Sequence, residues 1–298
     1  MLNTKVWIQA FRLRTLPLAL SSILMGIIVS YIHDGFHLEV SIWAIITTLF
    51  LQILSNLAND YGDAIKGTDN QNRIGPERTV QSGEISPKSM KYAIIIFALL
   101  SLLSGLILIW ISGINMLSAL MFLLLGILAI AAAIKYTVGK KAYGYSGLGD
   151  LFVFVFFGLL AVLGSFYLNT LTFSWDIVLP ATTIGLLSVA VLNLNNMRDL
   201  ENDKKSGKNT LVVRIGIKKA KLYHTIIVNI AFFSLMAFMS INSLSWEAHL
   251  ALLVYPLFII DLRKIDKITE LQYLDPFLKR TALKTLLLVV LLGVLLVF

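Results

Sequence analysis

Long apolar segments recur along the whole chain of 298 residues and are separated by polar stretches. A helix needs about 20 mostly apolar residues to cross a lipid bilayer. The segments that approach this length lie at about 15–32, 42–59, 92–111, 114–134, 148–168, 177–197, 222–241, 248–260 and 281–298. The eighth is the shortest and contains Pro256. The pattern predicts an all-α, polytopic membrane protein of about nine transmembrane helices around a central cavity.

The positively charged residues follow the same alternation. If successive loops lie on alternate sides of the membrane, all 25 Lys and Arg residues fall on one side. The loops on the other side contain acidic residues but no Lys or Arg. The positive-inside rule then predicts a multi-pass protein of the cell (cytoplasmic) membrane, with its N-terminus in the cytoplasm and its C-terminus outside. A soluble helical protein with a basic face would show this alternation only by chance.

The composition supports the membrane assignment. The chain is 57% hydrophobic and only 14% charged, whereas about 25% of the residues in soluble domains are charged. The net charge of +8 belongs to one membrane face. Basic loops there contact the anionic headgroups of membrane lipid, so the charge does not predict a nucleic-acid partner. The absence of cysteine excludes disulfides and thiolate metal ligands.

Two loops on the basic side, at about 60–91 and 198–221, are long and similar to each other. Each begins with asparagines at the end of an apolar segment and continues with spaced aspartates, Lys and Gly. Each then contains Arg-Ile-Gly, at 73–75 and at 214–216. We therefore expect a single domain over residues 1–298 with a weak internal duplication of a helix-plus-loop unit, a common way to build membrane folds.

Each long loop opens with a polar cluster at helical spacing, so that the members of a cluster share one helix face. The first cluster is Asn56, Asn59, Asp60 and Asp63, and the second is Asn195, Asp199 and Asp203. We expect the two faces to meet across a cavity that is open to the cytoplasmic side. Unpaired carboxylates would repel one another there, and a divalent cation would remove the repulsion. Oxygen ligands without Cys favour a hard ion such as Mg²⁺.

Basic residues accompany the acids in both loops. Lys66 and Arg78 lie in the first loop, and Arg198 and Lys208 lie in the second. Acids that hold a metal ion, next to cations that neutralise phosphate oxygens, indicate a phosphoryl or diphosphate site. The alternative is a set of solvated charges at helix ends that pair with one another.

At these positions the chain resembles a known family. The stretches "NDYGDAIKGTD" and "DLEND" resemble the two aspartate-rich motifs of the UbiA-like intramembrane prenyltransferases. The similarity extends through "RLRTLPLAL", "RIGPERTVQSG" and "YGYSGLGDLFVFVFFG". This family has nine transmembrane helices and uses Mg²⁺ to join a polyprenyl diphosphate to an aromatic acceptor. The branch that the chain resembles most uses 1,4-dihydroxy-2-naphthoate, in menaquinone biosynthesis. The broader family often has an aspartate where this chain has Gly67, and here Asp69 follows two positions later.

The resemblance implies a role for each matching residue. The residues expected to be catalytic are Asp60, Asp63, Asp199, Asp203 and Tyr136. The metal ligands would be the same four aspartates and Asp69. The residues expected to bind the substrates are Asn56, Asn59, Lys66, Arg78, Lys135, Asn195, Arg198, Lys208 and Arg14. Arg14 would meet the carboxylate of the acceptor, unless it is only a juxtamembrane charge, and Tyr143 and Tyr145 fit equally well as interfacial anchors.

The reaction implied by the resemblance is the Mg²⁺-dependent transfer of a polyprenyl group to 1,4-dihydroxy-2-naphthoate. Carbon dioxide and diphosphate are lost, and the reaction gives demethylmenaquinone. Two alternatives remain open: a prenyltransferase for another aromatic acceptor, of the 4-hydroxybenzoate type, and a cation-coupled membrane transporter. The ion sites of transporters usually lie near the bilayer midplane, whereas these acids gather at one face.

Overall fold

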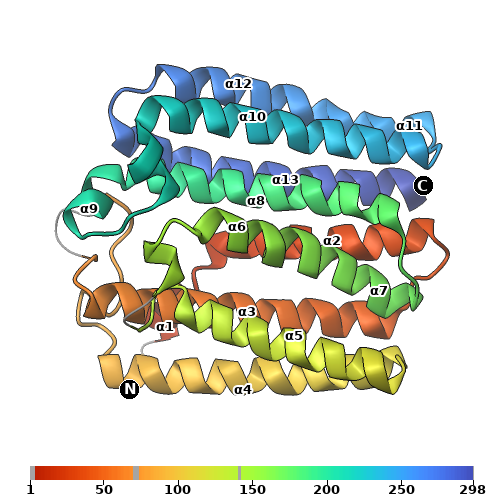
Figure 1. The fold of residues 1–298 in the computed structure, drawn as a ribbon, viewed down its shortest axis with the longest axis horizontal. Helices are drawn as coiled ribbons and strands as arrows, with labels where there is room; N and C mark the ends of the chain where they lie inside the picture. The colour runs from red at the N-terminus through yellow and green to blue at the C-terminus, as the bar shows by residue number, and fades with distance from the viewer. Residues whose placement is uncertain (1–3, 70–73, 140–141, 298) are drawn as a thin grey trace.

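The computed structural model describes residues 4–69, 74–139 and 142–297, and every regular element within these ranges is helical. Figure 1 shows the helices running side by side along the molecule. The first half contains α1 (Thr4–Phe11), η1 (Leu13–Thr15), α2 (Leu16–Ile32), α3 (Leu38–Ile65), α4 (Pro87–Ser112), α5 (Met116–Lys135) and η2 (Tyr143–Tyr145). Next come α6 (Gly149–Val153), η3 (Phe154–Leu163), α7 (Gly164–Thr170), η4 (Trp175–Ile177), α8 (Val178–Arg198) and α9 (Leu200–Lys205). The last elements are α10 (Leu211–Ile241), α11 (Trp246–His249), η5 (Leu250–Val254), α12 (Tyr255–Lys267), η6 (Leu271–Leu274) and α13 (Asp275–Val297).

Eight helical stretches of the described chain are long and apolar enough to cross a membrane. They coincide with eight of the predicted segments. The remaining segment, at 248–260, is divided among α11, η5 and α12. Pro256 has no backbone N–H to donate, and it therefore occupies the first turn of a new helix, α12. The prediction of an all-α polytopic membrane protein is confirmed in the described part of the chain, with eight candidate spans where about nine were predicted.

The chain begins and ends at opposite ends of the bundle. Figure 1 shows α1 at the same end as α9, while α13 finishes at the other end. It also shows α11 and α12 together lying along α10. We call the end that carries α9 and the long loops the polar end.

Local sequence signals set the turn between α4 and α5. The hydroxyl of Ser86 accepts a hydrogen bond from the N–H of Ser89 at 3.1 Å and so caps the start of α4. Gly113 ends α4 in the left-handed region, with φ of 67°. Asn115 then caps α5 by accepting the N–H of Ser118 at 2.9 Å. The turn is short because one glycine and one asparagine end the first helix and start the second.

The packed core surrounds α8, which lies against α2, η3, α10 and α13. Ile184 and Leu187 of α8 are fully buried there, together with Ala231 of α10. By contrast, α5 has no buried side chain. One face of α5, with Met121 and Leu128, is exposed, as expected of a helix in contact with lipid.

The π-helical segment η3 approaches α8 closely. A Cβ atom on Gly158 would lie 2.7 Å from the carbonyl oxygen of Ala181 and 2.7 Å from the Cα of Gly185, so only glycine fits there. π-helical turns are rare and occur frequently at functional sites. Phe156 and Leu160 of this segment both line the cavity described below.

The internal duplication stays a prediction. Position 73, in the first Arg-Ile-Gly, lies outside the described residues. In the second, Gly216 has a positive φ of 78° and interrupts the start of α10.

Candidate active site

A cavity of about 570 Å³ lies between α2, α3, α4, α5, η3 and α8. Its wall follows α3 from Ala44 to Asp63, a distance of about 28 Å at 1.5 Å per residue. Acids, amides and cations line it near the polar end, whereas Leu108, Phe122 and Leu168 line its other part. One chamber therefore joins a charged region to an apolar one, over nearly the ~30 Å thickness of a bilayer's hydrocarbon core.

Most of the predicted site residues line this cavity. They are Arg14, Asn56, Asn59, Asp63, Asp69, Arg78, Tyr136, Asn195, Asp199, Asp203 and Lys208. The predicted residues that do not line it are Asp60, Lys66, Lys135 and Arg198. Lys135, the last residue of α5, is exposed.

The two long loops meet at the polar end. The side-chain amide of Asn202, in α9, donates a hydrogen bond to the carbonyl of Thr68 at 2.9 Å. The N–H of Asn209 donates to the carbonyl of Tyr145 at 3.0 Å, which adds the loop after α5 to the contact. The two acidic clusters thus lie on either side of one space, as their helical spacing predicts.

Asp63 is held by a tyrosine from the loop after α5. The hydroxyl of Tyr145 donates a hydrogen bond to Oδ1 of Asp63 at 2.8 Å. The Nζ of Lys66 lies 3.9 Å from the centroid of the Tyr145 ring, and that of Lys208 lies 5.5 Å from it. Burial raises the pKa of Tyr145, and the charge of Asp63 raises it further, so the phenol keeps the proton that it donates.

Asp60 holds the first long loop in place. Its Oδ2 accepts hydrogen bonds from the N–H and the hydroxyl of Thr79, at 3.2 and 2.7 Å, and its Oδ1 accepts the N–H of Val80 at 3.3 Å. These bonds fix the segment that carries Arg78, whose Nε lies 3.7 Å from Oδ2 of Asp69. Asp60 does not line the cavity, and its predicted role as a metal ligand stays a prediction.

Arg198 is directed at acids of the protein rather than into the cavity. Its side chain is fully buried, and its Nε and Nη2 donate hydrogen bonds to the two carboxylate oxygens of Asp199, at 2.8 and 2.7 Å. Nη2 also donates to Oδ1 of Asn195 at 2.9 Å, and Nη1 donates to Asp275. The geometry therefore does not support Arg198 as a ligand of the diphosphate.

Lys208 lies between the two acidic clusters. Its Nζ is 3.8 Å from Oδ1 of Asp203. Burial would lower the pKa of Lys208, but the charges of Asp63 and Asp203 outweigh this effect and raise it. Burial raises the pKa of Asp203 to about 6 against the opposing effect of Lys208, and repulsion by Asp199 and Asp63 adds to the rise. The space is therefore crowded with negative charge that a further cation would stabilise.

The side chains fit a metal ion that arrives with a phosphate. Within the described ranges, no three acidic or imidazole groups converge closely enough to hold an ion by themselves. However, Oδ2 of Asp203 is buried and has no hydrogen-bond partner in the described part of the chain. Asp63, Asp69 and Asp199 line the same cavity and offer only oxygen atoms. This set suits Mg²⁺, which binds through one or two carboxylates and takes its other ligands from water and substrate phosphates.

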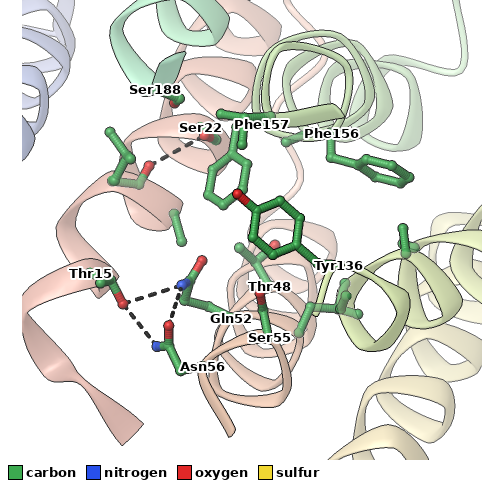
Figure 2. A pocket seen from close by; sticks show the side chains of 18 of the residues that line it. Thr15, Ser22, Thr48, Gln52, Ser55, Asn56, Tyr136, Phe156, Phe157 and Ser188 are labelled. Carbon is green, nitrogen blue, oxygen red and sulfur yellow. Dashed lines mark hydrogen bonds between the residues drawn. The ribbon is translucent and has the colours of Figure 1, made fainter. Parts of the chain in front are cut away.

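A directed network of hydrogen bonds lies deeper in the cavity (Figure 2). The side-chain amide of Asn56 donates to the carbonyl of Phe11 and to Oγ1 of Thr15, both at 2.9 Å. The hydroxyl of Thr15 donates to the carbonyl of Arg12 at 2.9 Å. Nε2 of Gln52 donates to Oγ1 of Thr15 at 3.2 Å and to Oδ1 of Asn56 at 3.3 Å. Since the backbone carbonyls can only accept, the direction of every bond in the network is determined.

The network leaves one acceptor for a ligand. Both amide hydrogens of Gln52 are committed, so its Oε1 is the group that it can offer. Figure 2 shows this side chain facing the part of the pocket where Tyr136, Phe156 and Phe157 lie. Burial raises the pKa of Tyr136 to about 12, which keeps its phenol neutral. The pocket thus has a hydrogen-bond acceptor on one wall and aromatic rings on the other.

Gln52 and Asp275 make contacts at this site that the sequence-based predictions do not contain, and the contact of Tyr145 with Asp63 was not among them either. A signal exists for Gln52, because it lies four residues before Asn56 in an apolar segment, where a polar side chain is costly. Asp275 is 77 residues from Arg198, and Tyr145 is 82 residues from Asp63. Spacing along the chain gives no signal for contacts of this kind.

Comparisons with known proteins agree with this geometry. Residues 19–272 match the model of the UbiA prenyltransferase family. The chain is 49% identical over 255 residues to the 1,4-dihydroxy-2-naphthoate octaprenyltransferase of Haemophilus influenzae, covering 85% of this chain and 83% of that protein. It is 45% identical over 282 residues to the Escherichia coli protein of the same name, covering 94% and 91%. A UbiA homologue from Archaeoglobus fulgidus bound to DMAPP and Mg²⁺ has the same fold, with a TM-score of 0.56 over 95% of this chain and 99% of that chain at 18% identity. By the extent of these matches, the chain belongs to the UbiA prenyltransferase family.

Proposed function

We propose that this protein transfers a polyprenyl group from a polyprenyl diphosphate to 1,4-dihydroxy-2-naphthoate. The observation that carries the proposal is the single cavity that joins a cluster of acids and cations to an apolar chamber. A donor with a charged head and a long hydrocarbon tail needs both parts. The acceptor is supported by the two bacterial relatives, whose names specify it.

The diphosphate would bind at the polar end. Lys208 and Arg78 line the cavity there. Nζ of Lys208 lies 3.8 Å from Asp203, and Nε of Arg78 lies 3.7 Å from Asp69. Each cation would bind phosphate oxygens in addition to its acid. The acids that would hold Mg²⁺ are Asp63, Asp69, Asp199 and Asp203. When bound, the ion supplies charge stabilisation to the leaving diphosphate.

The isoprenoid tail would lie in the apolar part of the cavity, between α4, α5 and η3. Glycines at Gly105, Gly126 and Gly164 widen this part of the wall. At Gly126 no atom lies within 4 Å of an added Cβ. The tail therefore meets apolar and aromatic side chains over its bound length, which is the favourable environment for a hydrocarbon.

The acceptor ring would lie between Gln52 and the aromatic wall of Tyr136 and Phe157. Oε1 of Gln52 would accept a hydrogen bond from a ring hydroxyl, and this interaction raises the electron density of the ring. Arg14 lines the cavity closer to the polar end and would meet the carboxylate of the acceptor.

The reaction balances without a further reactant. The allylic C–O bond of the donor breaks, and its electron pair leaves with the diphosphate. The ring carbon that bears the carboxylate forms the new C–C bond with the allylic carbon. The bond from that ring carbon to the carboxylate then breaks, its electron pair restores the aromatic ring, and carbon dioxide leaves. The product is the hydroquinone form of demethylmenaquinone, and the apolar walls keep water from the allylic cation meanwhile.

The polar end would face the cytoplasm. All 25 Lys and Arg residues belong to segments assigned to that side of the membrane, and such segments remain in the cytoplasm. This orientation places the N-terminus inside and the C-terminus outside. The basic loops would also contact anionic membrane lipid at that face.

The test is a decarboxylation assay. Membranes that contain the protein, Mg²⁺ and a polyprenyl diphosphate should release labelled carbon dioxide from carboxyl-labelled 1,4-dihydroxy-2-naphthoate, in proportion to the prenylated product. Membranes with Asp63→Ala serve as the control and should release almost none. If 4-hydroxybenzoate is prenylated with its carboxylate intact while the naphthoate is inert, the acceptor assignment is wrong.

A further inference from the structure

A buried ionic cluster connects the second acidic motif to the start of α13. Arg198 has the largest side chain among the fully buried residues of the described chain. Its guanidinium group forms a bidentate pair with Asp199, with N–O distances of 2.8 and 2.7 Å, and donates a further bond to Oδ1 of Asp275. One cation therefore joins two carboxylates that come from different helices.

Asp275 is not needed to neutralise Arg198. The bidentate pair with Asp199 already has no net charge, and Asp275 accepts a hydrogen bond from Nη1, the nitrogen that neither Asp199 nor Asn195 contacts. The second carboxylate gives the cluster a net charge of −1. Asp275 is the first residue of α13, its side chain is 38% exposed, and it lines the same cavity as Asp199. The extra negative charge therefore lies at the site, not in the core.

The second carboxylate changes what Asp199 can bind. Both oxygens of Asp199 accept hydrogen bonds from Arg198, and a carboxylate keeps about two further lone-pair directions for another ligand. In an isolated pair the guanidinium would withdraw much of the charge that a metal ion needs. Asp275 shares the guanidinium group, so more negative charge stays on Asp199. It also fixes the plane of Arg198, and with it the orientation of Asp199.

We propose that Asp275 is a positioning residue that acts through Arg198. It orients Asp199 and keeps the second acidic cluster negative enough to bind a divalent cation. The inference rests on the proposed function, in which Asp199 helps to hold Mg²⁺. It makes α13 part of the site, although α13 contains neither aspartate-rich motif.

The chain offers a matched control in the same region. Asp261 of α12 is buried, lies 2.6 Å from Nζ of Lys284 and is 3.9 Å from Nη1 of Arg280, both on α13. Like Arg198 and its acids, Asp261 and its two cations form an ionic cluster between two helices, here α12 and α13. However, it does not line the cavity. Asp261→Asn removes a comparable carboxylate without a connection to the acidic clusters.

The experiment measures metal binding directly on the purified full-length protein in detergent. Mn²⁺ serves as the probe, its free fraction is read by electron paramagnetic resonance in the presence of inorganic diphosphate, and thermal unfolding is followed in the same samples. Asp275→Asn should bind Mn²⁺ about tenfold more weakly, as is usual when a partner that orients a metal ligand is lost. Asp275→Glu, which keeps the charge, should restore most of the affinity. Asp261→Asn should lower the melting temperature and leave the Mn²⁺ affinity unchanged.

Asp275→Ser provides a second uncharged variant with a shorter side chain. Wild-type Mn²⁺ affinity in either folded uncharged variant would overturn the proposal, as would an equal loss of affinity in Asp261→Asn. The samples contain neither the prenyl donor nor the aromatic acceptor. A negative result in the decarboxylation assay would therefore refute the proposed function alone, whereas normal Mn²⁺ binding by the Asp275 variants would refute this inference alone.

Discussion

The hydroxyl of Tyr145 donates a hydrogen bond to Oδ1 of Asp63 at 2.8 Å and so joins the loop after α5 to the end of α3. Tyr145→Phe removes this bond, and hydrogen bonds to charged groups contribute about 1.5–3 kcal/mol. We expect turnover to fall about tenfold, because Asp63 loses the partner that orients it. The control is Tyr143→Phe, since the hydroxyl of Tyr143 donates only to the carbonyl of Ala132, at 2.8 Å. Equal losses of turnover in the two variants would show that Tyr145 has only a structural role.

The two aspartates at the end of α3 should respond differently to substitution. Asp63→Ala should nearly abolish turnover with little change in melting temperature, because Asp63 lines the cavity. Asp60→Ala leaves the backbone N–H groups of Thr79 and Val80 without their acceptor, at a cost of about 1–3 kcal/mol for each buried group. It should therefore lower the melting temperature first. Thermal unfolding and turnover measured on both variants check this, and a fully stable but inactive Asp60→Ala protein would return Asp60 to the metal site.

Gln52 should determine how a ring hydroxyl is bound. Gln52→Met keeps the length of the side chain but removes Oε1, and a neutral hydrogen bond contributes about 0.5–1.5 kcal/mol. The KM for the naphthoate should rise about two- to tenfold, whereas the KM for the donor should not change. Ser55→Ala is the control, because Ser55 lines the cavity outside the network.

Acceptor analogues that lack one hydroxyl make the Gln52 test sharper. The wild-type protein should bind an analogue without the hydroxyl that contacts Gln52 more weakly than it binds the naphthoate. In Gln52→Met the same loss should have little further effect, because the partner is already absent. If the analogue and the substitution weaken binding independently, Gln52 does not contact that hydroxyl.

The width of the cavity at α5 should influence the length of the tail that is accepted. Gly126→Leu places a branched side chain where the wall is open. The ratio of kcat/KM for a short prenyl diphosphate to that for a long one should increase, because the short tail does not reach the obstruction. Leu124→Phe is the matched control on the same helix, since Leu124 is 58% exposed and does not line the cavity. An unchanged ratio in Gly126→Leu would place the tail elsewhere.

The orientation in the membrane can be checked with a reporter fused after Phe298. The assignment of all Lys and Arg residues to the cytoplasmic side requires an odd number of passes, so the reporter should lie outside the cytoplasm. A cytoplasmic reporter would mean that the divided segment around Pro256 does not cross the membrane.

The fold could be predicted because a bilayer imposes a simple rule. Each pass needs a long apolar helix whose backbone hydrogen bonds are satisfied internally, and this requirement is visible in the sequence. The segment around Pro256 was the shortest of those predicted, and it is the one that none of the eight long apolar helical stretches of the described chain contains. The helical spacing of the clusters also placed Asp63 and Asp203 at one cavity, and the family assignment decides against the transporter alternative.

The direction of individual side chains could not be predicted in the same way. Asp60 and Asp63 lie on one helix face, but Asp60 is taken up by Thr79, which the first long loop brings back to α3. Arg198 has the residue type and the position of a diphosphate ligand. However, Asp275 at the start of α13 accepts a hydrogen bond from its guanidinium group, which points away from the cavity. For both residues, a contact between distant parts of the chain determines where the side chain points, and local spacing does not record such contacts.

The absence of buried side chains on α5 has a consequence for the kinetics of the enzyme. Phe122 and Gly126 line the cavity, while Met121 and Leu128 lie exposed on the outer face, so a single helix separates the bound tail from lipid. In the proposed binding mode the donor would enter from the plane of the membrane, so the quantity that governs occupancy of the site would be the number of donor molecules per lipid molecule. Adding inert lipid at a fixed total amount of donor should slow the reaction, as for any catalyst whose substrate is diluted in two dimensions.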